Sequence, residues 1–299
     1  MDTEKCKAAL YAVELGSLSA AAEKLGYTTS GISRMMQALE EEEGFPLLVR
    51  SRGGVAPTEA MKKLAPVYRE LIRWADTCAQ VSAEISGAQI GSVTVGLSYS
   101  AYFSWIAEVI GGFRKDYPAI EIHLLYGNSS ELTHAMIEHK ADFCIVSRRE
   151  TGDVWIPLIR DPMVAWVPGN HPLAEKEAFP VSAFETEPFI DFFPGTETDN
   201  TRLFAKLHIH PNIRFSSTDA GAAYAMVGAG LGVTLNNSLT ARDWHGRVKV
   251  LPLDPPQYVD ICITYPDREF ISPAAGRFVD YALRHAQKSL SGMAGLTNV

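Results

Sequence analysis

The apolar positions in residues 1–26 predict two short helices separated by a glycine. Residues 9–13 carry apolar side chains at helical spacing, and the pattern stops at Gly16, a residue that favours a helix end. Ser19 precedes the alanine-rich stretch 20–25, where its hydroxyl can cap a second helix and small side chains allow close packing. Gly26 then makes a tight turn.

The next segment has an apolar stripe on one side and a short polar face on the other. Thr28 can cap a helix over Thr29–Glu42. Its spacing predicts a buried stripe made of Ile32, Met36 and Leu39. Residues 47–50 and 55–57 flank a glycine turn, which predicts a small β-hairpin.

From Thr58 to about Ser86 the apolar residues keep a three-four rhythm that predicts one long helix. They are Met61, Leu64, Ala65, Tyr68, Leu71, Ile72, Ala75, Cys78, Ala79 and Ile85. Such a stripe needs a partner surface, either the same helix of a second chain or the helix's own domain. Pro66 lies inside the stretch and is expected to bend the helix or to leave a carbonyl free.

Strand and helix patterns alternate after residue 91, which predicts an α/β domain with a largely parallel sheet. The expected strands are residues 93–97, 121–126, 143–146, 163–167, 189–192, 213–216, 233–235 and 259–265. The glycine run 228–232 follows a helix and lacks the third glycine at dinucleotide spacing. It therefore predicts a tight helix-to-strand turn rather than a nucleotide-binding loop.

Charge complicates the assignment of a partner. The formal net charge is −8, whereas proteins that hold DNA mainly by charge are usually basic. The glutamates at 40–43 follow the polar face and are expected to form a solvated surface. The N-terminus has no apolar leader, and no later run approaches the roughly 18 apolar residues of a membrane span, so a cytoplasmic location is expected. Any contact with DNA must depend on where the few arginines lie.

The polar face of the third helix suits the reading of base edges. A short helix, a glycine turn and a second helix with such a face fit a helix-turn-helix, whose second helix enters the major groove. Arg34 and Gln37 can make bidentate contacts to guanine and adenine, and arginines on a hairpin wing would reach phosphates or the minor groove. The alternative is a solvated face on an ordinary bundle. The residues expected to contact DNA are Thr28, Thr29, Ser30, Ser33, Arg34, Gln37, Arg50 and Arg52.

The order and spacing of these residues resemble the LysR-type transcriptional regulators. The resemblance is carried by residues 16–25 (GSLSAAAEKL), 32–34 (ISR), 39–44 (LEEEEG) and the wing at 50–60. Later segments agree, so it extends over nearly the whole chain: Tyr117-Pro118, Ala141-Asp142-Phe143, His171-Pro172-Leu173-Ala174 and residues 227–233 (VGAGLGV).

Three positions depart from the pattern of these regulators. Thr29 stands where glutamine is frequent, Met61 where glycine is frequent, and Asn236 where proline is usual. Threonine cannot make glutamine's bidentate contact to adenine, so that base contact is not expected at Thr29.

The resemblance implies an α/β protein in three parts. They are an all-α-dominated winged helix-turn-helix domain (1–58), a long linker and dimerisation helix (59–87), and a two-lobed, periplasmic-binding-protein-like effector domain (88–299). One lobe is expected over about 90–161 and 267–290 and the other over about 162–266, with crossovers near Asp161 and Pro266. The implied function is ligand-responsive, sequence-specific regulation of transcription, with a small anionic or aromatic metabolite bound between the lobes.

In open α/β sheets a ligand lies beyond the carboxyl ends of the strands, where helix N-termini offer free amides. Hydroxyl groups there suit a carboxylate, with Arg148 as its counter-charge, and nearby aromatic side chains admit an aromatic ligand. Helix capping without a ligand is the alternative. The residues expected to contact the effector are Ser98, Tyr99, Ser100, Ala101, Tyr102, Asn128, Ser129, Ser147, Arg148, Phe192, Thr196, Ser217 and Thr218.

Other functions would need different residues. Catalytic residue types are present, but no nucleophile, base and orienting acid can be assembled from the sequence, so no catalytic residues and no enzyme are expected. His208 and His210 have no carboxylate or thiolate near them and make a poor metal site. A thiol redox sensor of the same fold is the stronger alternative. Cys144 and Cys262 lie in predicted strands and lack adjacent basic residues that would lower a thiol pKa.

The expected partners follow from these interpretations. They are double-stranded operator DNA, a small-molecule effector and further copies of the chain in a homodimer or homotetramer, with RNA polymerase as a further possible partner. No cofactor, metal or membrane contact is expected.

The two classes of arginine should be separable by substitution. Arg34→Ala should weaken binding to a selected operator by about 1–3 kcal/mol and relax the preference at one base position, because it removes a base-edge contact. Arg52→Ala should weaken binding to all sequences alike. Fluorescence anisotropy against single-base operator variants measures both, and equal losses with unchanged preference in both variants would contradict this division of roles.

Overall fold

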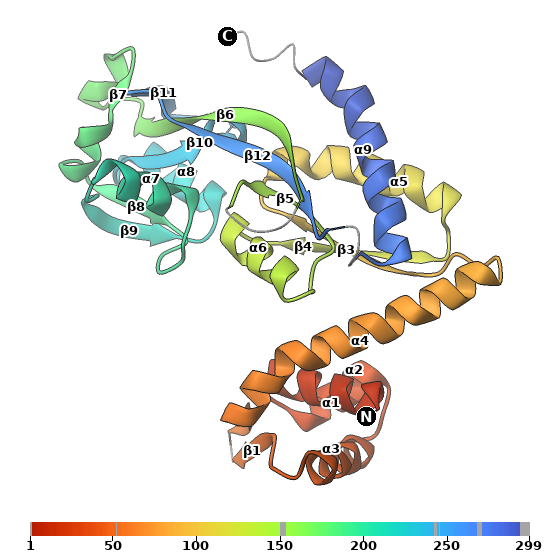
Figure 1. Cartoon of the computed structure of the whole chain (residues 1–299). Helices are drawn as coiled ribbons and strands as arrows, with labels where there is room; N and C mark the ends of the chain where they lie inside the picture. The colour runs from red at the N-terminus through yellow and green to blue at the C-terminus, as the bar shows by residue number, and fades with distance from the viewer. Residues whose placement is uncertain are drawn as a thin grey trace. The chain divides into compact units, whose positions relative to one another are not determined.

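The computed structural model describes residues 2–51, 53–149, 154–241, 244, 246–267 and 271–293, with side chains up to residue 286 except at residue 241. The chain divides into two compact units, Met1–Gly91 and Ser92–Val299, whose elements are labelled in Figure 1. Arg52, one of the residues expected to contact DNA, lies outside the described residues.

Three helices form the core of the first unit. They are α1 (Thr3–Glu14), α2 (Leu18–Leu25) and α3 (Thr29–Glu43). The stripe predicted for α3 is confirmed, because Ile32, Met36 and Leu39 are fully buried. They share one hydrophobic cluster with alanines of the two preceding helices, namely Ala8, Ala9, Ala12, Ala21 and Ala22.

The helix caps agree with the sequence pattern at one position and differ at another. Thr28 caps α3 as expected, since its Oγ1 accepts a hydrogen bond from the N–H of Gly31 at 3.1 Å. The cap expected for α2 is wrong by two residues. Ser17 is extended, with φ of −154°, and its Oγ accepts from the N–H of Ala20. Ser19 already lies in the first turn of the helix, so its hydroxyl cannot take that role.

The predicted hairpin is confirmed as β1 (Leu48–Ser51) paired antiparallel with β2 (Gly54–Pro57). It is held against the turn between α1 and α2. The N–H of Val55 donates to the carbonyl of Gly16 at 2.8 Å, and a β-carbon at Gly54 would lie 2.4 Å from the same carbonyl oxygen. Gly54 also has φ of +120°, so this close approach requires glycine.

Two of the four glutamates at the end of α3 are structural, so the expectation of a solvated surface is confirmed for Glu41 and Glu42, which are exposed, and is wrong for Glu40 and Glu43. Glu40 Oε1 accepts hydrogen bonds from the N–H groups of Leu47 at 2.7 Å and Leu48 at 3.0 Å. Glu43 Oε1 accepts from the hydroxyl of Tyr68 at 3.0 Å. These carboxylates fasten the start of β1 and the long helix onto α3.

The long helix is confirmed as α4 (Glu59–Ile85), capped by Thr58. Its inner apolar face packs within its own unit, so part of the predicted stripe meets its own domain. Met61 and Tyr68 are fully buried there, and four residues pack around them: Leu64, Ala65, Leu71 and Ile72.

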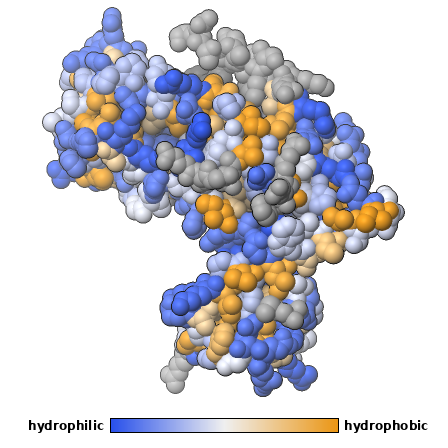
Figure 2. All heavy atoms as spheres, viewed as in Figure 1, coloured by the Kyte–Doolittle hydropathy of each residue, from blue (hydrophilic) through white to orange (hydrophobic). Residues whose placement is uncertain are grey.

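A second apolar face of α4 is exposed. It contains Val67, Trp74 and Val81, seven residues apart, and Ile85, which is 84% exposed. Cys78 and Ile85 follow Trp74 and Val81 by four residues, which fits the a/d alternation of a coiled coil, whereas Leu71, four residues after Val67, is half-buried against the core of its own unit. We call this face the seam, and its C-terminal end contributes to apolar surface in Figure 2. Val67, Trp74 and Val81 were absent from the predicted stripe.

The second unit is built on one large mixed sheet. Its strands run in the order β4-β3-β5-β12-β6-β11-β7, and β10 also pairs with β6. Their bounds are β3 Gly91–Leu97, β4 Ile120–Tyr126, β5 Phe143–Ser147, β6 Val154–Pro168, β7 Phe179–Pro180, β10 Thr234–Asn237, β11 Val248–Asp254 and β12 Tyr258–Tyr265. A separate parallel pair is formed by β8 (Phe189–Phe192) and β9 (Ile213–Ser217).

The expectation of a largely parallel sheet is wrong. Both β12 and β11 pair antiparallel with β6, and β12 also pairs antiparallel with β5. The cause is the length of β6, which extends nine residues upstream of the predicted strand at 163–167 and offers antiparallel partners a long template. The strands β7 and β11 were not predicted.

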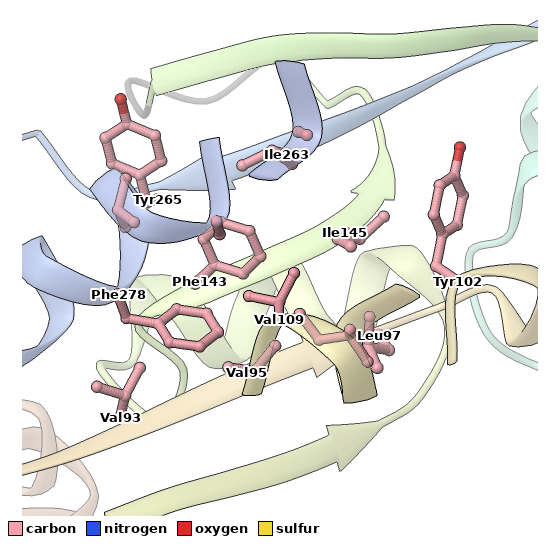
Figure 3. Packing of buried hydrophobic residues seen from close by; sticks show 14 of the residues in the cluster. Val93, Val95, Leu97, Tyr102, Val109, Phe143, Ile145, Ile263, Tyr265 and Phe278 are labelled. Atoms are coloured by element: carbon pink, nitrogen blue, oxygen red, sulfur yellow. The ribbon is translucent and has the colours of Figure 1, made fainter. Parts of the chain in front are cut away.

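The described part of the unit also contains the α-helices α5 (Phe103–Asp116), α6 (Ser129–Ile137), α7 (Asp199–Leu207), α8 (Ala220–Gly228) and α9 (Pro273–Met293). In the first lobe α5 and α9 cover β3, β5 and β12, and the side chains between them form the cluster in Figure 3. The second lobe packs α7 against β8 through Phe184, Phe189 and Phe204. The glycine run 228–232 is the helix-to-strand turn that its pattern predicts.

The strand pairing bears on where the chain passes between the lobes. Residues of β6 up to Pro162 pair with β12, and those from Met163 onward pair with β10 and β11. Ile261 and Ile263 of β12 belong to the first-lobe cluster. We therefore propose that the second crossover precedes Tyr258 rather than following β12 near Pro266.

Among the described helices, none is long and apolar enough to cross a membrane.

Glu40→Ala should loosen the wing more than Glu41→Ala does. Loss of the Glu40 carboxylate leaves two backbone N–H groups without their charged acceptor, at a cost of about 1–3 kcal/mol. Hydrogen exchange of peptides that cover residues 46–51 measures this local opening. Glu41 is exposed on the same turn and is the control, so equal protection of the wing in the two variants would contradict the prediction.

Candidate functional site

The polar face of α3 is one candidate site. Ser33 Oγ accepts a hydrogen bond from Nη1 of Arg50 at 3.3 Å, which ties the wing to the helix. Gln37 Nε2 donates to Glu41 Oε1 at 3.0 Å. Arg34 is exposed, and in the described part of the chain its guanidinium has no partner. Arg34 is therefore free to reach a base edge, whereas Gln37 must first release Glu41.

The N-terminal end of this face is formed by hydroxyl groups. Thr28, Thr29 and Ser30 are all exposed, and the hydroxyl oxygens of Thr28 and Ser30 lie 3.1 Å apart. Free amides of the first helical turn lie beside them, a setting that suits a phosphate oxygen. The structure thus gathers on one surface the expected DNA-contacting residues that it describes.

A pocket between the two lobes is the second candidate site. The space within it, including space open to solvent, amounts to about 690 Å³. Its lining is Ser98, Tyr99, Ser100, Tyr126, Gly127, Asn128 and Ser129 from the first lobe, and Met163, Phe192, Phe193, Thr198, Asp199, Asn200, Ala220, Asn236, Asn237 and Thr240.

Six of the residues expected to contact an effector line this pocket: Ser98, Tyr99, Ser100, Asn128, Ser129 and Phe192. Seven others do not: Ala101, Tyr102, Ser147, Arg148, Thr196, Ser217 and Thr218. Tyr102 is buried in the first-lobe core. The hydroxyl of Thr196 donates to the backbone carbonyl of Phe193 at 2.8 Å. The hydroxyl of Ser217 donates to the backbone carbonyl of Asp219 at 2.9 Å.

A carboxylate of the second lobe is held by donors of the first. Asp199 Oδ1 accepts from Nη1 of Arg149 at 3.0 Å and from the hydroxyl of Ser147 at 2.6 Å. Its Oδ2 accepts from the hydroxyl of Tyr99 at 2.9 Å. Ser129 donates to the hydroxyl of Ser98 at 3.1 Å and accepts from the N–H of Ser147 at 3.0 Å. Hydroxyls expected to bind an effector are thus joined to a partner within the chain.

The cation of this network is Arg149 rather than Arg148. Arg148 is exposed, whereas Arg149 is only 8% exposed. The ion pair between Arg149 and Asp199 is partly buried on both sides. Burial and the nearby Asp199 carboxylate raise the pKa of Tyr99 well above its ordinary value. Tyr99 therefore stays protonated and donates to Asp199.

Residues at the start of α7 and the end of β10 were missed by sequence reasoning. Thr198, Asp199 and Asn200 line the pocket, as do Asn236 and Asn237. A helix N-terminus was signalled by the threonines at 198 and 201, which form a reciprocal capping box. At Asn236 the sequence departs from the LysR-type pattern, in which proline is usual, but that departure alone does not predict a place in the pocket.

The other chemistries find little support in the described residues. No group of three or more His, Cys, Asp or Glu side chains among them is placed to hold a metal ion. Cys144 and Cys262 are buried, and burial raises the pKa of the Cys262 thiol, which disfavours the reactive thiolate. His208 is the left-handed cap residue of α7.

Comparison with known proteins agrees with this division of the chain. Residues 4–62 match the family described as bacterial regulatory helix-turn-helix protein, lysR family. Residues 86–287 match the LysR substrate binding domain. The HTH-type transcriptional regulator YybE of Bacillus subtilis (strain 168) is 27% identical over 273 residues, which cover 89% of this chain and 92% of YybE.

Solved structures share the fold at low sequence identity. A full-length OxyR variant from Pseudomonas aeruginosa superposes with a TM-score of 0.68 at 17% identity, covering 96% of this chain and 95% of that one. Full-length CbnR in complex with its target DNA has a TM-score of 0.62 at 20% identity, covering 95% of this chain and 100% of that one. These likenesses support the arrangement of a helix-turn-helix unit followed by a two-lobed domain.

Proposed function

Since this chain belongs to the LysR family of bacterial helix-turn-helix regulators, we propose that it senses a small metabolite bound between the two lobes of its substrate-binding domain. It is a DNA-binding transcriptional regulator and not an enzyme. The observation that carries the proposal is the pocket, whose lining comes from both lobes.

A ligand in this position would act on the geometry of the domain. It would contact Ser98 to Ser100 and Asn128 on one side and Thr198 to Asn200 on the other. A ligand shifts an equilibrium only by its difference in affinity between two states. A ligand that contacts both lobes has different affinities for two states in which the lobes are differently spaced. Most of the lining residues carry a hydroxyl or amide side chain, which supports a metabolite with polar groups, and Tyr126 and Phe192 admit a ring.

DNA recognition is proposed to use α3 from two copies of the chain. One copy offers a small polar face on which, among the described residues, Arg34 is unpaired, and the net charge of −8 gives little general attraction to phosphates. Pairing two such units places two recognition helices on two half-sites, and the second contact becomes intramolecular. A contact with RNA polymerase stays a prediction.

The seam of α4 supports a homodimer. Its a/d spacing and exposure fit a surface that a second copy of the same helix would cover. Assembly into a homotetramer stays a prediction.

A charge on the seam should dissociate the dimer. Val81→Glu buries a carboxylate if the seam is paired, which is costly, so we expect a monomeric mass by analytical ultracentrifugation at micromolar concentration. Ala79→Glu places the same charge at an exposed position of α4 outside the seam and should remain dimeric. Dimers in both variants would contradict pairing through the seam.

Filling the pocket should abolish ligand binding. A compound that raises the melting temperature of the full chain in a screen of small carboxylates should have no effect on Ala220→Trp, because Ala220 lines the pocket. Ala222 is exposed on the same helix and does not line the pocket, so Ala222→Trp should respond like the parent chain. A response that survives in Ala220→Trp would place the ligand elsewhere.

A further inference from the structure

Asp199 is the one charged residue in the pocket lining that the structure describes. Its two carboxylate oxygens take three hydrogen bonds from the first lobe, given by Tyr99, Ser147 and Arg149. A ligand carboxylate placed beside it would meet a like charge. A ligand cation would find the Asp199 carboxylate already paired with a guanidinium.

The donor cluster is assembled by the first lobe alone. Nε and Nη2 of Arg149 both donate to the hydroxyl of Ser130 at 3.2 Å. Nη1 also lies within hydrogen-bond distance of the carbonyl oxygens of Ser147 (3.3 Å) and Arg148 (3.2 Å) and of the hydroxyl of Ser147, which can share its two hydrogens. These bonds hold the guanidinium in place without Asp199. The cluster is thus a preorganised receptor for a carboxylate, which an arginine and two hydroxyls bind well.

Asp199 can leave this receptor without unravelling its helix. It is the first residue of α7, and the cap of α7 is made by Thr198 and Thr201, whose side chains and backbone N–H groups bond each other. The Asp199 side chain takes no part in that cap. Beside a helix N-terminus, a released carboxylate also keeps a favourable position.

The side-chain amide of Asn128 is a second hydrogen-bond donor in the pocket. The side chain of Asn128 is 6% exposed and lines the pocket. Its Oδ1 accepts from the N–H of Glu131 at 2.9 Å, which fixes the orientation of the amide. Its Nδ2 is buried and has no partner among the described residues. An unpaired buried donor costs free energy, so a ligand acceptor at this point would be favoured.

We propose that Asp199 is an internal substitute for the carboxylate of the ligand. In the free protein Asp199 occupies the receptor formed by Tyr99, Ser147 and Arg149. Its ion pair and hydrogen bonds there connect the second lobe to the first. A small carboxylate with a further oxygen acceptor takes its place, bonds Asn128 and releases α7. The ligand carboxylate replaces the Asp199 carboxylate, so the Arg149 guanidinium stays paired with one negative charge. The contacts that Asp199 makes between the two lobes are lost. This inference rests on the proposed function, because it concerns the same pocket.

Removal of the tethered carboxylate should open the receptor to a free one. The full-length Asp199→Ala chain should be stabilised by acetate and formate, with a half-saturating concentration at least about tenfold lower than for the parent chain, since ligand that binds only the folded state raises its stability. Chloride at the same ionic strength should have no such effect. Asp219→Ala removes another carboxylate at a helix N-terminus of the second lobe, one that caps α8, and should respond like the parent.

The role of the receptor is tested by adding a second substitution. Asp199→Ala combined with Arg149→Met should lose the acetate response, whereas Asp199→Ala combined with Arg148→Met should keep it. If Asp199→Ala does not fold, Asp199→Ser also vacates the receptor and keeps a polar residue at the start of α7. A folded Asp199 variant that acetate and formate fail to stabilise, or a response that survives loss of Arg149, overturns the proposal.

This outcome is distinguishable from failure of the proposed function. A metabolite whose effect is blocked by Ala220→Trp would still place a ligand between the lobes, even if acetate never replaces Asp199. Conversely, an acetate response that depends on Arg149 would establish the receptor even if no metabolite acts through the pocket.

Discussion

The second unit depends on the continuous pairing of β6 with its neighbours. A buried strand must pair its backbone N–H and C=O groups, and β6 does so along Val154–Pro168, apart from a bulge at Leu158, by changing partners after Pro162. Asp161 lies at that change. Its carboxylate accepts from Nδ2 of Asn237 at 2.7 Å and from the N–H of Leu239 at 3.1 Å. The strand that begins in the first lobe thus also positions the second-lobe wall of the pocket.

Local patterns predicted the elements whose determinants are local. The stripe of α3, its cap at Thr28 and the hairpin all follow from periodicity and turn chemistry within a few residues. Long-range pairing was harder to foresee. The upstream part of β6 becomes a strand because β12 lies beside it, and Glu40 becomes structural because the start of β1 returns to it. Neither partner is adjacent in the sequence.

The pocket shows the same limit at the level of side chains. The rule that ligands lie beyond strand ends correctly pointed to Ser98 and Asn128 as pocket residues, because it depends on sheet geometry alone. It could not separate Arg148 from Arg149, since neighbouring residues at a strand end point in different directions. Nor could it find Asp199, whose role exists only because the second lobe brings α7 against the first.

The two faces of α4 would couple folding to association if the seam pairs as proposed. Its first turns complete the core of the helix-turn-helix unit through Met61 and Tyr68, while its later turns present the seam to solvent. If a second copy covers the seam, as we propose, the free energy of pairing adds to the stability of the DNA-binding unit. By mass action, the fraction of folded DNA-binding units would then rise with the concentration of the chain. The abundance of the regulator would thereby become a determinant of its own structure.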